Sequence, residues 1–422
     1  MREMKDSGVE WIGKIPAHWI INRGKYVFDY LQKPVKPTDE VITCFRDGEV
    51  TLRSNRREEG FTFSEKEIGY QGVDIGDLVI HGMDGFAGAI GISDSRGKAS
   101  PVLNVLGTDQ NKRYYMYYLR AMAFTEVFTA TATGIRVRSC DLRWNKLAEF
   151  PYPVPPIYEQ ERITSFLDSK CAEIDSISED IRKEIETLQE YRKSIITEAV
   201  TKGLDPNAEM KDSGVEWIGM IPNSWELEKG KYVFIQKNER GNTICLQLLS
   251  PTQKYGVIPQ DKYEELSGMK AVKLNEKVDL SELKTVHKGA FCISLRSFQG
   301  GFEYSDYEGV VSPAYQIFYP TRNICDDYYR YLFKTQGFIQ EMNSFTMSLR
   351  DGKNIAFEDF GNSLIPVPPL SIQNDIATFL NTKCSEIDSI IADKQKQLDV
   401  LAEYRKSLIY EYVTGKKEVP TK

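Results

Sequence analysis

PVPPIYEQERITSFLDSKCAEIDSISEDIRKEIETLQEYRKSIITEAVTKG occupies residues 153–203, and a close copy of it returns at residues 366–415. Two adjacent prolines open each copy, and such a pair cannot lie inside a helix but can immediately precede one. Beyond them, apolar residues recur every seven positions, at Leu167, Ile174, Ile181, Leu188 and Ile195. We expect the same side to be filled by Ile163, Cys171, Ile177 and Ile185. Apolar heptads separated by charged residues over this many turns predict a coiled coil, with each helix about 65 Å long.

The second copy carries a matching apolar stripe. Its members are Leu380, Ile387, Leu401 and Leu408, beside Cys384, Ile391 and Leu398. FLDSKCAEIDSI at residues 166–177 corresponds to FLNTKCSEIDSI at residues 379–390, and EYRKSII at residues 190–196 corresponds to EYRKSLI at residues 403–409. Identity at this level indicates that both long helices arose by duplication.

A second repeated segment, here called the opener, begins each half of the chain. MKDSGVEWIGKIPAHW at residues 4–19 returns as MKDSGVEWIGMIPNSW at residues 210–225, and GKYVF follows both, at residues 24–28 and 230–234. The chain is therefore one unit of opener, globular region and long helix written twice. Two copies are too few for a solenoid, so the sequence predicts a covalent pseudo-dimer.

Between opener and long helix the two halves diverge into regions that we call heads. Glycine-broken apolar runs predict strands at residues 41–45, 49–52, 77–80 and 89–92, and at residues 243–248, 290–295 and 315–319. Helices are expected near residues 112–129 and 326–343. Strands followed by helices predict an α+β class for each head.

The order of the segments predicts the domain organisation. We expect one globular domain at residues 1–152, a spacer helix at 153–205, a second globular domain at 206–365 and a second spacer helix at 366–415. If the second helix packs on the first, it runs back along it, which gives an antiparallel coiled-coil pair with pseudo-two-fold symmetry and one head at each end. Gly203 followed by Pro206 predicts the end of the first helix. The tail at residues 414–422 is expected to fray.

Composition and charge limit the class of protein. A hydrophobic content of 41% over 422 residues is enough for two packed domains. The opening residues lack the apolar core of a signal peptide, and no apolar run is long enough to span a membrane. The seven cysteines form no CxxC pair, which favours reduced thiols in the cytoplasm. A net charge of −7 argues against a simple nucleic-acid binder, so any contact with DNA must be local to the heads.

The doubled opener and the doubled coil together resemble the specificity subunit of type I restriction–modification systems. GVVSPAYQIFYP at residues 309–320 and KASPVLNVL at residues 98–106 also resemble segments of that family's target recognition domains. The resemblance implies a non-catalytic subunit in which each target recognition domain reads one half of a bipartite DNA sequence. It also implies that the helices set the gap and dock two methyltransferase subunits, with restriction subunits joining the complex. S-adenosylmethionine, ATP and Mg²⁺ are then expected on partner subunits, and no cofactor or metal on this chain.

No motif for catalysis is found in the sequence itself. The only Pro-Pro pairs lie at the coil starts, so the Asn/Asp-Pro-Pro-aromatic loop of an adenine methyltransferase is missing. The glycine-rich run at residues 85–91 lacks the spacing of a nucleotide fingerprint. His18, His81 and His287 lie far apart in the sequence, without metal-ligand spacing. A fused methyltransferase or nuclease is therefore disfavoured.

Basic and amide residues beside turns are the candidates for DNA contact, because arginine reads guanine, Gln and Asn read adenine, and Lys and Ser commonly bind phosphate. A solvated surface is the alternative interpretation for each of them. The candidates are Arg46, Arg53, Arg56, Arg57, Arg136, Arg138 and Arg143 in the first head, and Arg296, Ser297, Gln299, Arg350, Lys353 and Asn354 in the second. Because the chain is acidic overall, we expect it to bind DNA weakly alone and tightly with its partners.

The repeated segments are the candidates for partner docking, because surfaces that stay alike should face the same neighbour. The docking candidates are Trp11, Trp217, Tyr191, Arg192, Tyr404 and Arg405. Two alternatives remain. The openers and coils could match only because they pack on each other, or the whole chain could be a scaffold that holds two proteins without reading DNA.

Overall fold

A computed structural model describes residues 2–56, 68–130, 142–240, 247–269, 280–293, 301–345 and 355–420. The chain divides into two compact units. Unit 1 contains Met1–Arg182 and Gln395–Lys422, and unit 2 contains Lys183–Lys394. Each unit combines an opener, a head of strands and short helices, and one part of each long helix, which confirms the predicted α+β class.

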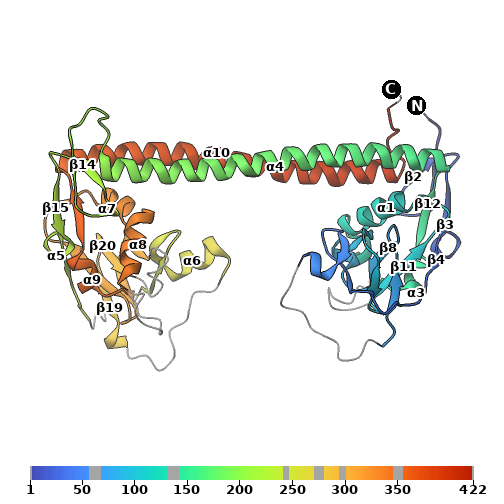
Figure 1. Cartoon of the computed structure of the whole chain (residues 1–422), viewed down its shortest axis with the longest axis horizontal. Coiled ribbons are helices and arrows are strands. Elements are labelled where there is room, and N and C mark those ends of the chain that lie inside the picture. Colours follow the sequence, from blue (N-terminus) through green and yellow to red (C-terminus); the bar gives the residue numbers. More distant parts are fainter. Residues whose placement is uncertain are drawn as a thin grey trace. The chain divides into compact units, whose positions relative to one another are not determined.

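The two long helices are α4 (Ile157–Lys202) and α10 (Leu370–Val413), green and red in Figure 1. In unit 1, Arg405 of α10 pairs with Asp175 of α4 at 2.9 Å. In unit 2, Arg192 of α4 pairs with Asp388 of α10 at 3.1 Å, and Lys394 pairs with Glu184. Within unit 2, residue numbers rise along one helix as they fall along the other. In unit 1 the ring centroid of Phe166 lies 4.6 Å from that of Tyr412, so numbers rise from Phe166 to Asp175 as they fall from Tyr412 to Arg405. The helices therefore pair antiparallel in each unit.

The apolar seam between the helices follows the predicted heptads with one correction. Leu167, Cys171 and Ile174 are buried, as are their copies Leu380, Cys384 and Ile387. Ile177, however, is 42% exposed, and its copy Ile390 is 46% exposed. Ser178 is buried in place of Ile177, because the seam advances by alternating steps of four and three residues and passes from Ile174 to Ser178 and then Ile181.

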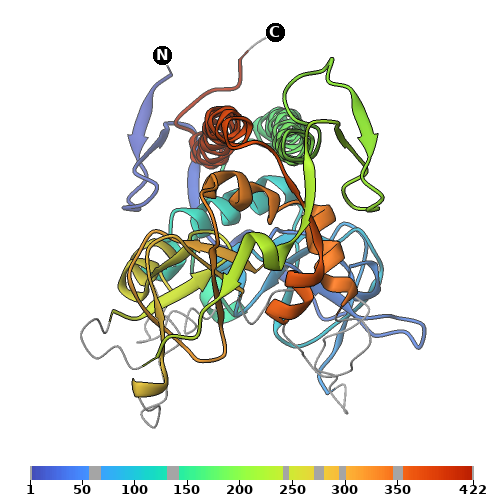
Figure 2. The ribbon, with the colours of Figure 1, turned by 90° about the vertical axis from the view of Figure 1, so that its left-hand side faces the viewer.

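The openers fold into β-hairpins that the sequence did not predict. In unit 1, β1 (Met4–Asp6) pairs with β2 (Lys14–Pro16), and β3 (Ile20–Arg23) pairs with β12 (Pro151–Val154), the strand that leads into α4. Unit 2 repeats this with β13 (Met210–Asp212), β14 (Met220–Pro222), β15 (Glu226–Lys229) and β24 (Leu364–Val367). Figure 2, which views the helices end-on, shows the green hairpin β13–β14 beside α4. The Pro-Pro pair before each long helix therefore comes directly after a strand, β12 or β24, that pairs with the strand following the opener of the same unit.

The head of unit 1 is built from short antiparallel strands. Its largest sheet has the order β4 (Asp29–Tyr30), β11 (Leu103–Gly107), β8 (Leu78–His81) and β9 (Ile90–Ile92). Two further pairs are β5 (Ile42–Cys44) with β6 (Val50–Leu52), and β7 (Gln71–Val73) with β10 (Gly97–Ala99). Short helices are η1 (Gly24–Tyr26), η2 (Arg53–Asn55), η3 (Gly85–Ala87), α2 (Val127–Ala130) and α3 (Trp144–Leu147). The strands expected at residues 41–45, 49–52, 77–80 and 89–92 are confirmed as β5, β6, β8 and β9.

The helix expected over residues 112–129 is interrupted. Helix α1 covers Lys112–Phe124, and α2 begins only at Val127. Between them Glu126 has a φ of 58°, a left-handed conformation that ends a right-handed helix. Tyr114 of α1 packs in the same core as α4 and α10, and its hydroxyl donates to the carbonyl oxygen of Val413 at 2.7 Å.

The head of unit 2 has a larger sheet. Its order is β16 (Phe234–Gln236), β23 (Gln316–Pro320), β20 (Ala290–Ile293), β21 (Phe302–Ser305), β18 (Gly256–Pro259) and β17 (Leu249–Thr252), with only β18 and β21 parallel among these pairs. A separate pair joins β19 (Lys284–Val286) to β22 (Gly309–Val311). The helices are α5 (Gly230–Val233), α6 (Gln260–Ser267), η5 (Leu280–Glu282), α7 (Asp326–Leu332), α8 (Gln336–Ser344) and α9 (Phe357–Asn362). The strand expected at residues 243–248 lies largely outside the described residues.

The helix expected over residues 326–343 is also two helices. Helix α7 ends at Leu332, and the Thr335 hydroxyl accepts from the amide of Phe338 to begin α8. An N-cap of this kind starts a new helix rather than continuing the old one. Tyr328 of α7 donates to the carbonyl oxygen of Val200 in α4 at 2.8 Å, which repeats in unit 2 the contact that Tyr114 makes in unit 1.

The end of the first long helix is as predicted, but the tail is not frayed over the described residues. Gly203 adopts a φ of 78° directly after α4. Arg2 of the opener donates to the carbonyl oxygens of Gly415 and Lys417 at 2.6 and 3.1 Å, and Val419 packs against the core of unit 1. These contacts bind the chain's last described residues to its first.

Candidate functional site

Most of the predicted DNA-contacting residues lie outside the described residues. They are Arg57, Arg136, Arg138, Arg296, Ser297, Gln299, Arg350, Lys353 and Asn354. Those inside are Arg46, Arg53, Arg56 and Arg143, all in the head of unit 1. DNA contact stays a prediction for every residue in both groups.

Three of the described candidates surround one hairpin. Arg46 lies in the turn between β5 and β6. The helical turn η2 comes directly after β6; Arg53 is its first residue, and Arg56 is the residue that follows it. Arg46 pairs with Asp84 at 2.9 Å and its side chain is largely exposed. Arg56 pairs with Asp47 at 2.8 Å, and its guanidinium lies 4.1 Å from the ring centroid of Phe45. Carboxylates therefore hold two guanidinium groups in place at the surface, where an anionic ligand could replace them.

The turn after β8 connects this hairpin with the fourth candidate. Asp84 in that turn binds Arg46, and Gly82 accepts from the amide of Leu142 at 2.8 Å, next to Arg143. Arg143 itself stands at the start of α3 and its carbonyl oxygen accepts from the first turn of that helix. The fold thus places Arg143 near the turn that carries Asp84, the partner of Arg46, although Arg46 and Arg143 are almost a hundred residues apart in the sequence. Sequence reasoning could not have placed them side by side.

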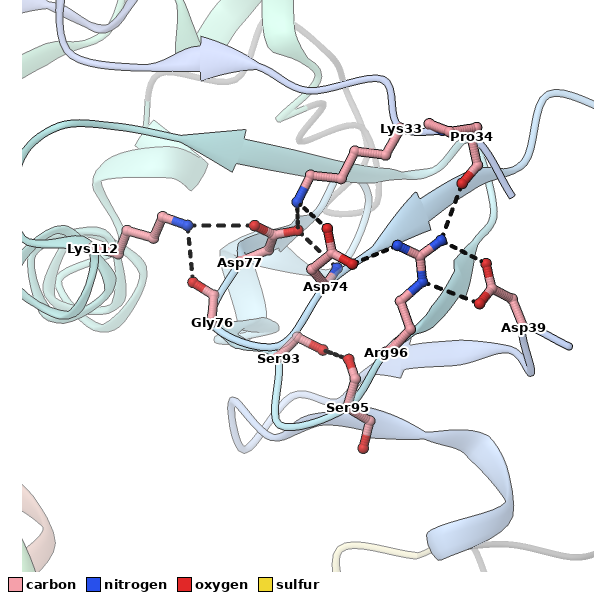
Figure 3. Close-up of polar contacts among 10 residues, drawn as sticks. All are labelled: Lys33, Pro34, Asp39, Asp74, Gly76, Asp77, Ser93, Ser95, Arg96 and Lys112. Atoms are coloured by element: carbon pink, nitrogen blue, oxygen red, sulfur yellow. Dashed lines mark hydrogen bonds and ion pairs between the residues drawn. The ribbon is translucent and has the colours of Figure 1, made fainter. Parts of the chain in front are cut away.

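An ion-pair network joins the loops that lead into β5, β8 and β10 (Figure 3). Arg96 binds both oxygens of Asp39, at 3.1 and 2.8 Å, and also pairs with Asp74. Lys33 binds Asp74 at 2.8 Å and Asp77 at 2.6 Å. The carboxylates of Asp39 and Asp77 are almost fully buried, and such charges are tolerated only when paired and hydrogen-bonded.

The network acts on the hairpin through the adjoining backbone. Asp39 precedes Glu40, whose carbonyl oxygen accepts from the amide of Lys98 in β10 at 2.8 Å, so the base of the hairpin is fixed. Hydrogen bonds from Lys33 and then Arg96 lower the pKa of Asp74 to about 2, which keeps the network charged at neutral pH. No sequence motif marks this network, since its members come from three separate loops. It is a support for the surface rather than a site for chemistry.

The six docking candidates occupy two kinds of position. Arg192 and Arg405 form the reciprocal ion pairs of the coil described above, so each EYRKS motif binds the EIDSI motif of the other helix. Tyr191 and Tyr404, beside them, are more than half exposed. Trp11 stacks on Phe150 with ring centroids 5.6 Å apart, and Trp217 packs edge-on against Phe338 at 5.7 Å. The arginines and tryptophans thus have contacts within the chain, while the two tyrosines present their rings to solvent. Partner docking stays a prediction for all six.

The described residues contain no cluster of three or more His, Cys, Asp or Glu side chains that could hold a metal ion. His18 and His287 instead lie against Glu159 and Glu239, at 2.5 and 2.9 Å. Within the same part of the chain, no helix has both the length and the apolar character needed to cross a bilayer.

Comparison with known proteins supports one of these interpretations. Residues 219–399 match the family model of the type I restriction modification DNA specificity domain. These residues form a type I DNA specificity domain. The resemblance seen in the repeated segments is thereby confirmed, and with it a role in DNA sequence specificity. Specificity subunits are non-catalytic components of these systems, in line with the missing catalytic motifs.

Relatives of the specificity domain cover nearly the whole chain. The putative type I restriction enzyme MjaX specificity subunit of Methanocaldococcus jannaschii is 23% identical over 97% of this chain and 96% of its own length. A chain solved in work on the assembly and conformational transition of a type I R-M system has a TM-score of 0.69 at 12% identity, over 96% of this chain and 99% of that one. The HsdS subunit of Thermoanaerobacter tengcongensis has a TM-score of 0.53 at 12% identity, over 96% and 98%. At such low identity the two structures show a shared fold alone.

Proposed function

We propose that the chain is the non-catalytic subunit that reads a bipartite DNA target, with one target recognition domain for each half-site, and docks two methyltransferase subunits. The observation that carries the proposal is the contrast within one chain. The openers are nearly identical and the Arg192–Asp388 and Arg405–Asp175 pairs of the coil are equivalent, whereas the two heads have sheets of different size and order. Like surfaces suit two copies of one partner, and unlike heads suit two different half-sites.

The hairpin of unit 1 gives the proposal a chemical basis. Arg46 is an exposed guanidinium on a turn, and an arginine so placed can contact guanine or phosphate when DNA replaces its carboxylate partner. The ion-pair network keeps the hairpin fixed, which limits the entropy lost when DNA binds. Binding by one head remains weak because few phosphates are neutralised, so partner subunits supply the remaining affinity.

Two repeated pairs of exposed residues on the coil support docking. Tyr191 and Tyr404 occupy equivalent positions and are both exposed, as are Ile177 and Ile390. None of these four is needed in the buried seam, although large apolar residues are costly to leave in water. Their repetition on both helices fits one equivalent contact with each of two methyltransferase subunits. S-adenosylmethionine, ATP and Mg²⁺ would then be bound by partner subunits, and restriction subunits would complete the assembly.

A scaffold without DNA readout is the second candidate, and the coil favours it in one respect. The reciprocal pairs Arg192–Asp388 and Arg405–Asp175 explain why EYRKS and EIDSI repeat without invoking any partner. They do not explain why Tyr191 and Tyr404 repeat while exposed, or why arginines gather at one hairpin.

Methylation mapping tests the proposed function. The chain is expressed with its methyltransferase subunits, and modified adenines are located by methylation-aware sequencing. We expect a bipartite motif of fixed gap, and exchange of residues 29–150 for those of another specificity subunit should change one half-site only. Arg46→Ala should weaken modification, whereas Arg330→Ala, which removes an arginine of unit 2 that pairs with Asp327 within the same helix, should leave it unchanged. Complexes that assemble but give no DNA protection and no motif would favour the scaffold.

A further inference from the structure

The repeated segment GKYVF contains two residues that packing does not explain. Gly24 and Gly230 are required because an added Cβ would lie 2.1 Å from the carbonyl oxygen of Leu147 and 2.7 Å from that of Phe360. The final Val-Phe pair is buried in both copies, as Val27, Phe28, Val233 and Phe234. Three of the five positions are therefore fixed by the fold. The lysine and the tyrosine between them are not.

These two residues form the same exposed arrangement in each unit, which we call the Lys–Tyr platform. Tyr26 is 73% exposed and Tyr232 is 62% exposed. Lys25 Nζ lies 5.5 Å from the ring centroid of Tyr26, and Lys231 Nζ lies 5.8 Å from that of Tyr232. A lysine at this distance is attracted by the face of the ring and restricts the tyrosine before any partner arrives.

A second cation flanks each platform. It is Arg23 in unit 1 and Lys229 in unit 2, each two residues before the lysine. In unit 1 both cations share Glu149, at 2.8 Å, and in unit 2 Lys231 donates to the amide oxygen of Asn362 at 3.1 Å. An exposed aromatic ring with two cations beside it complements a protein surface that offers an apolar pocket with carboxylates at its rim.

The position of the platform argues for a protein rather than DNA. In unit 1 it directly follows β3, which lies at the opposite side of the head from the blue hairpin that carries Arg46 (Figure 1). A DNA half-site seated on the hairpin would therefore not cover Tyr26.

We infer that the Lys–Tyr platform of each unit is a docking site for one methyltransferase subunit, with Tyr26 and Tyr232 as the anchoring side chains. The inference rests on the proposed function and adds to the coil a second contact for the same partner. Exposed tyrosines that insert into a partner's pocket commonly dominate the energy of such an interface. Because the platforms are equivalent, each governs one of two separate binding events.

The test uses the full chain and its purified cognate methyltransferase subunit, with stoichiometry from native mass spectrometry and affinity from titration calorimetry. Tyr26→Ala and Tyr232→Ala should each leave one tight site and weaken the other by about tenfold or more, and the double variant should weaken both. Tyr158→Ala removes another exposed tyrosine of unit 1, which is not repeated because Ser371 stands in the second copy, and should change nothing. Both altered residues are largely exposed, so the melting temperature should not change.

Two outcomes would overturn the inference and can be told apart. If the variants still bind two methyltransferase subunits with unchanged affinity, the platform is not a docking site, although the proposed function still stands. The same conclusion holds if they lose DNA binding instead. An unaltered chain that binds no methyltransferase subunit contradicts the proposed function, and the platform with it.

Discussion

Glu303 gives the sharpest prediction about stability. It lies on β21 in the head of unit 2, with 2% of its side chain exposed, and accepts a hydrogen bond from Lys334 at 2.6 Å. Burial disfavours the charged carboxylate and raises the pKa of Glu303 from its ordinary 4.5 to about 7, although Lys334 opposes the shift. The native state then holds a proton that the unfolded chain releases.

The sign of the effect follows from this difference. A raised native pKa gives stability that is complete below about pH 4.5 and is lost as the pH rises towards 7, so unit 2 should weaken across this interval. A shift of this size corresponds to roughly 3 kcal/mol at 1.36 kcal/mol per pKa unit, as an order of magnitude. Glu303→Gln keeps an acceptor for Lys334 but carries no charge. It should therefore raise the free energy of unfolding by up to about 3 kcal/mol at pH 8 and have little effect at pH 4.5.

Urea denaturation at several pH values tests this prediction by giving the free energy of unfolding. Hydrogen exchange of the amides in β20 and β21 follows the transition of unit 2. Glu308→Gln, in the same head but with an exposed carboxylate, is the matched control and should leave the pH profile unchanged. A Glu303→Gln variant whose free energy of unfolding differs from that of the unaltered chain by the same amount at every pH would refute the reasoning, because the charge of Glu303 would then have no effect on stability.

Three further predictions concern unit 1. Leu167→Ala should lower the free energy of unfolding by about 2–5 kcal/mol because it opens a cavity in the seam. Ile177→Ala, at an exposed position, should lower it by less than about 0.5 kcal/mol. Equal losses in urea denaturation would contradict the corrected seam. Arg96→Ala should destabilise the head by about 3–5 kcal/mol, since it leaves the buried carboxylate of Asp39 without its partner, and thermal melting would show this. The depressed pKa of Asp74 adds stability above its ordinary 3.8 that is lost as the pH falls towards about 2, so an acid titration of Asp74→Asn should show a shallower fall than the unaltered chain.

The sequence was sufficient for features that repeat or follow a period. The coil, its antiparallel pairing within each unit, the α+β heads and four strands of the first head are confirmed. Ile177 was misplaced because a heptad count alone does not distinguish the seam from the position beside it, where the buried residue is Ser178. The expected single helix at residues 112–129 failed at Glu126, where a left-handed residue overrides helix propensity.

The surfaces proposed for binding were only partly accessible to sequence reasoning. Arg46 and Arg56 were identified from their turns, but nothing local linked them to Arg143, since that proximity depends on a hydrogen bond from Leu142 to Gly82. The pairing of Asp39 with Arg96 is likewise a product of tertiary structure. Tyr26 and Tyr232 belong to the repeated GKYVF segment, but only the fold shows that both are exposed, and their exposure is what indicates a docking site.

The hydrogen bond from Tyr114 to Val413 has a consequence for synthesis of the protein, because these residues are 299 positions apart. Unit 1 takes its helix partner from Gln395–Lys422, so its core stays open until these residues have been translated. A nascent chain would expose Leu167 and the tyrosines of α1 throughout this delay, and contacts so distant in sequence close slowly. Unit 2 draws on one continuous stretch, Lys183–Lys394, and can fold first, so unit 1 is completed after unit 2 although its synthesis begins earlier.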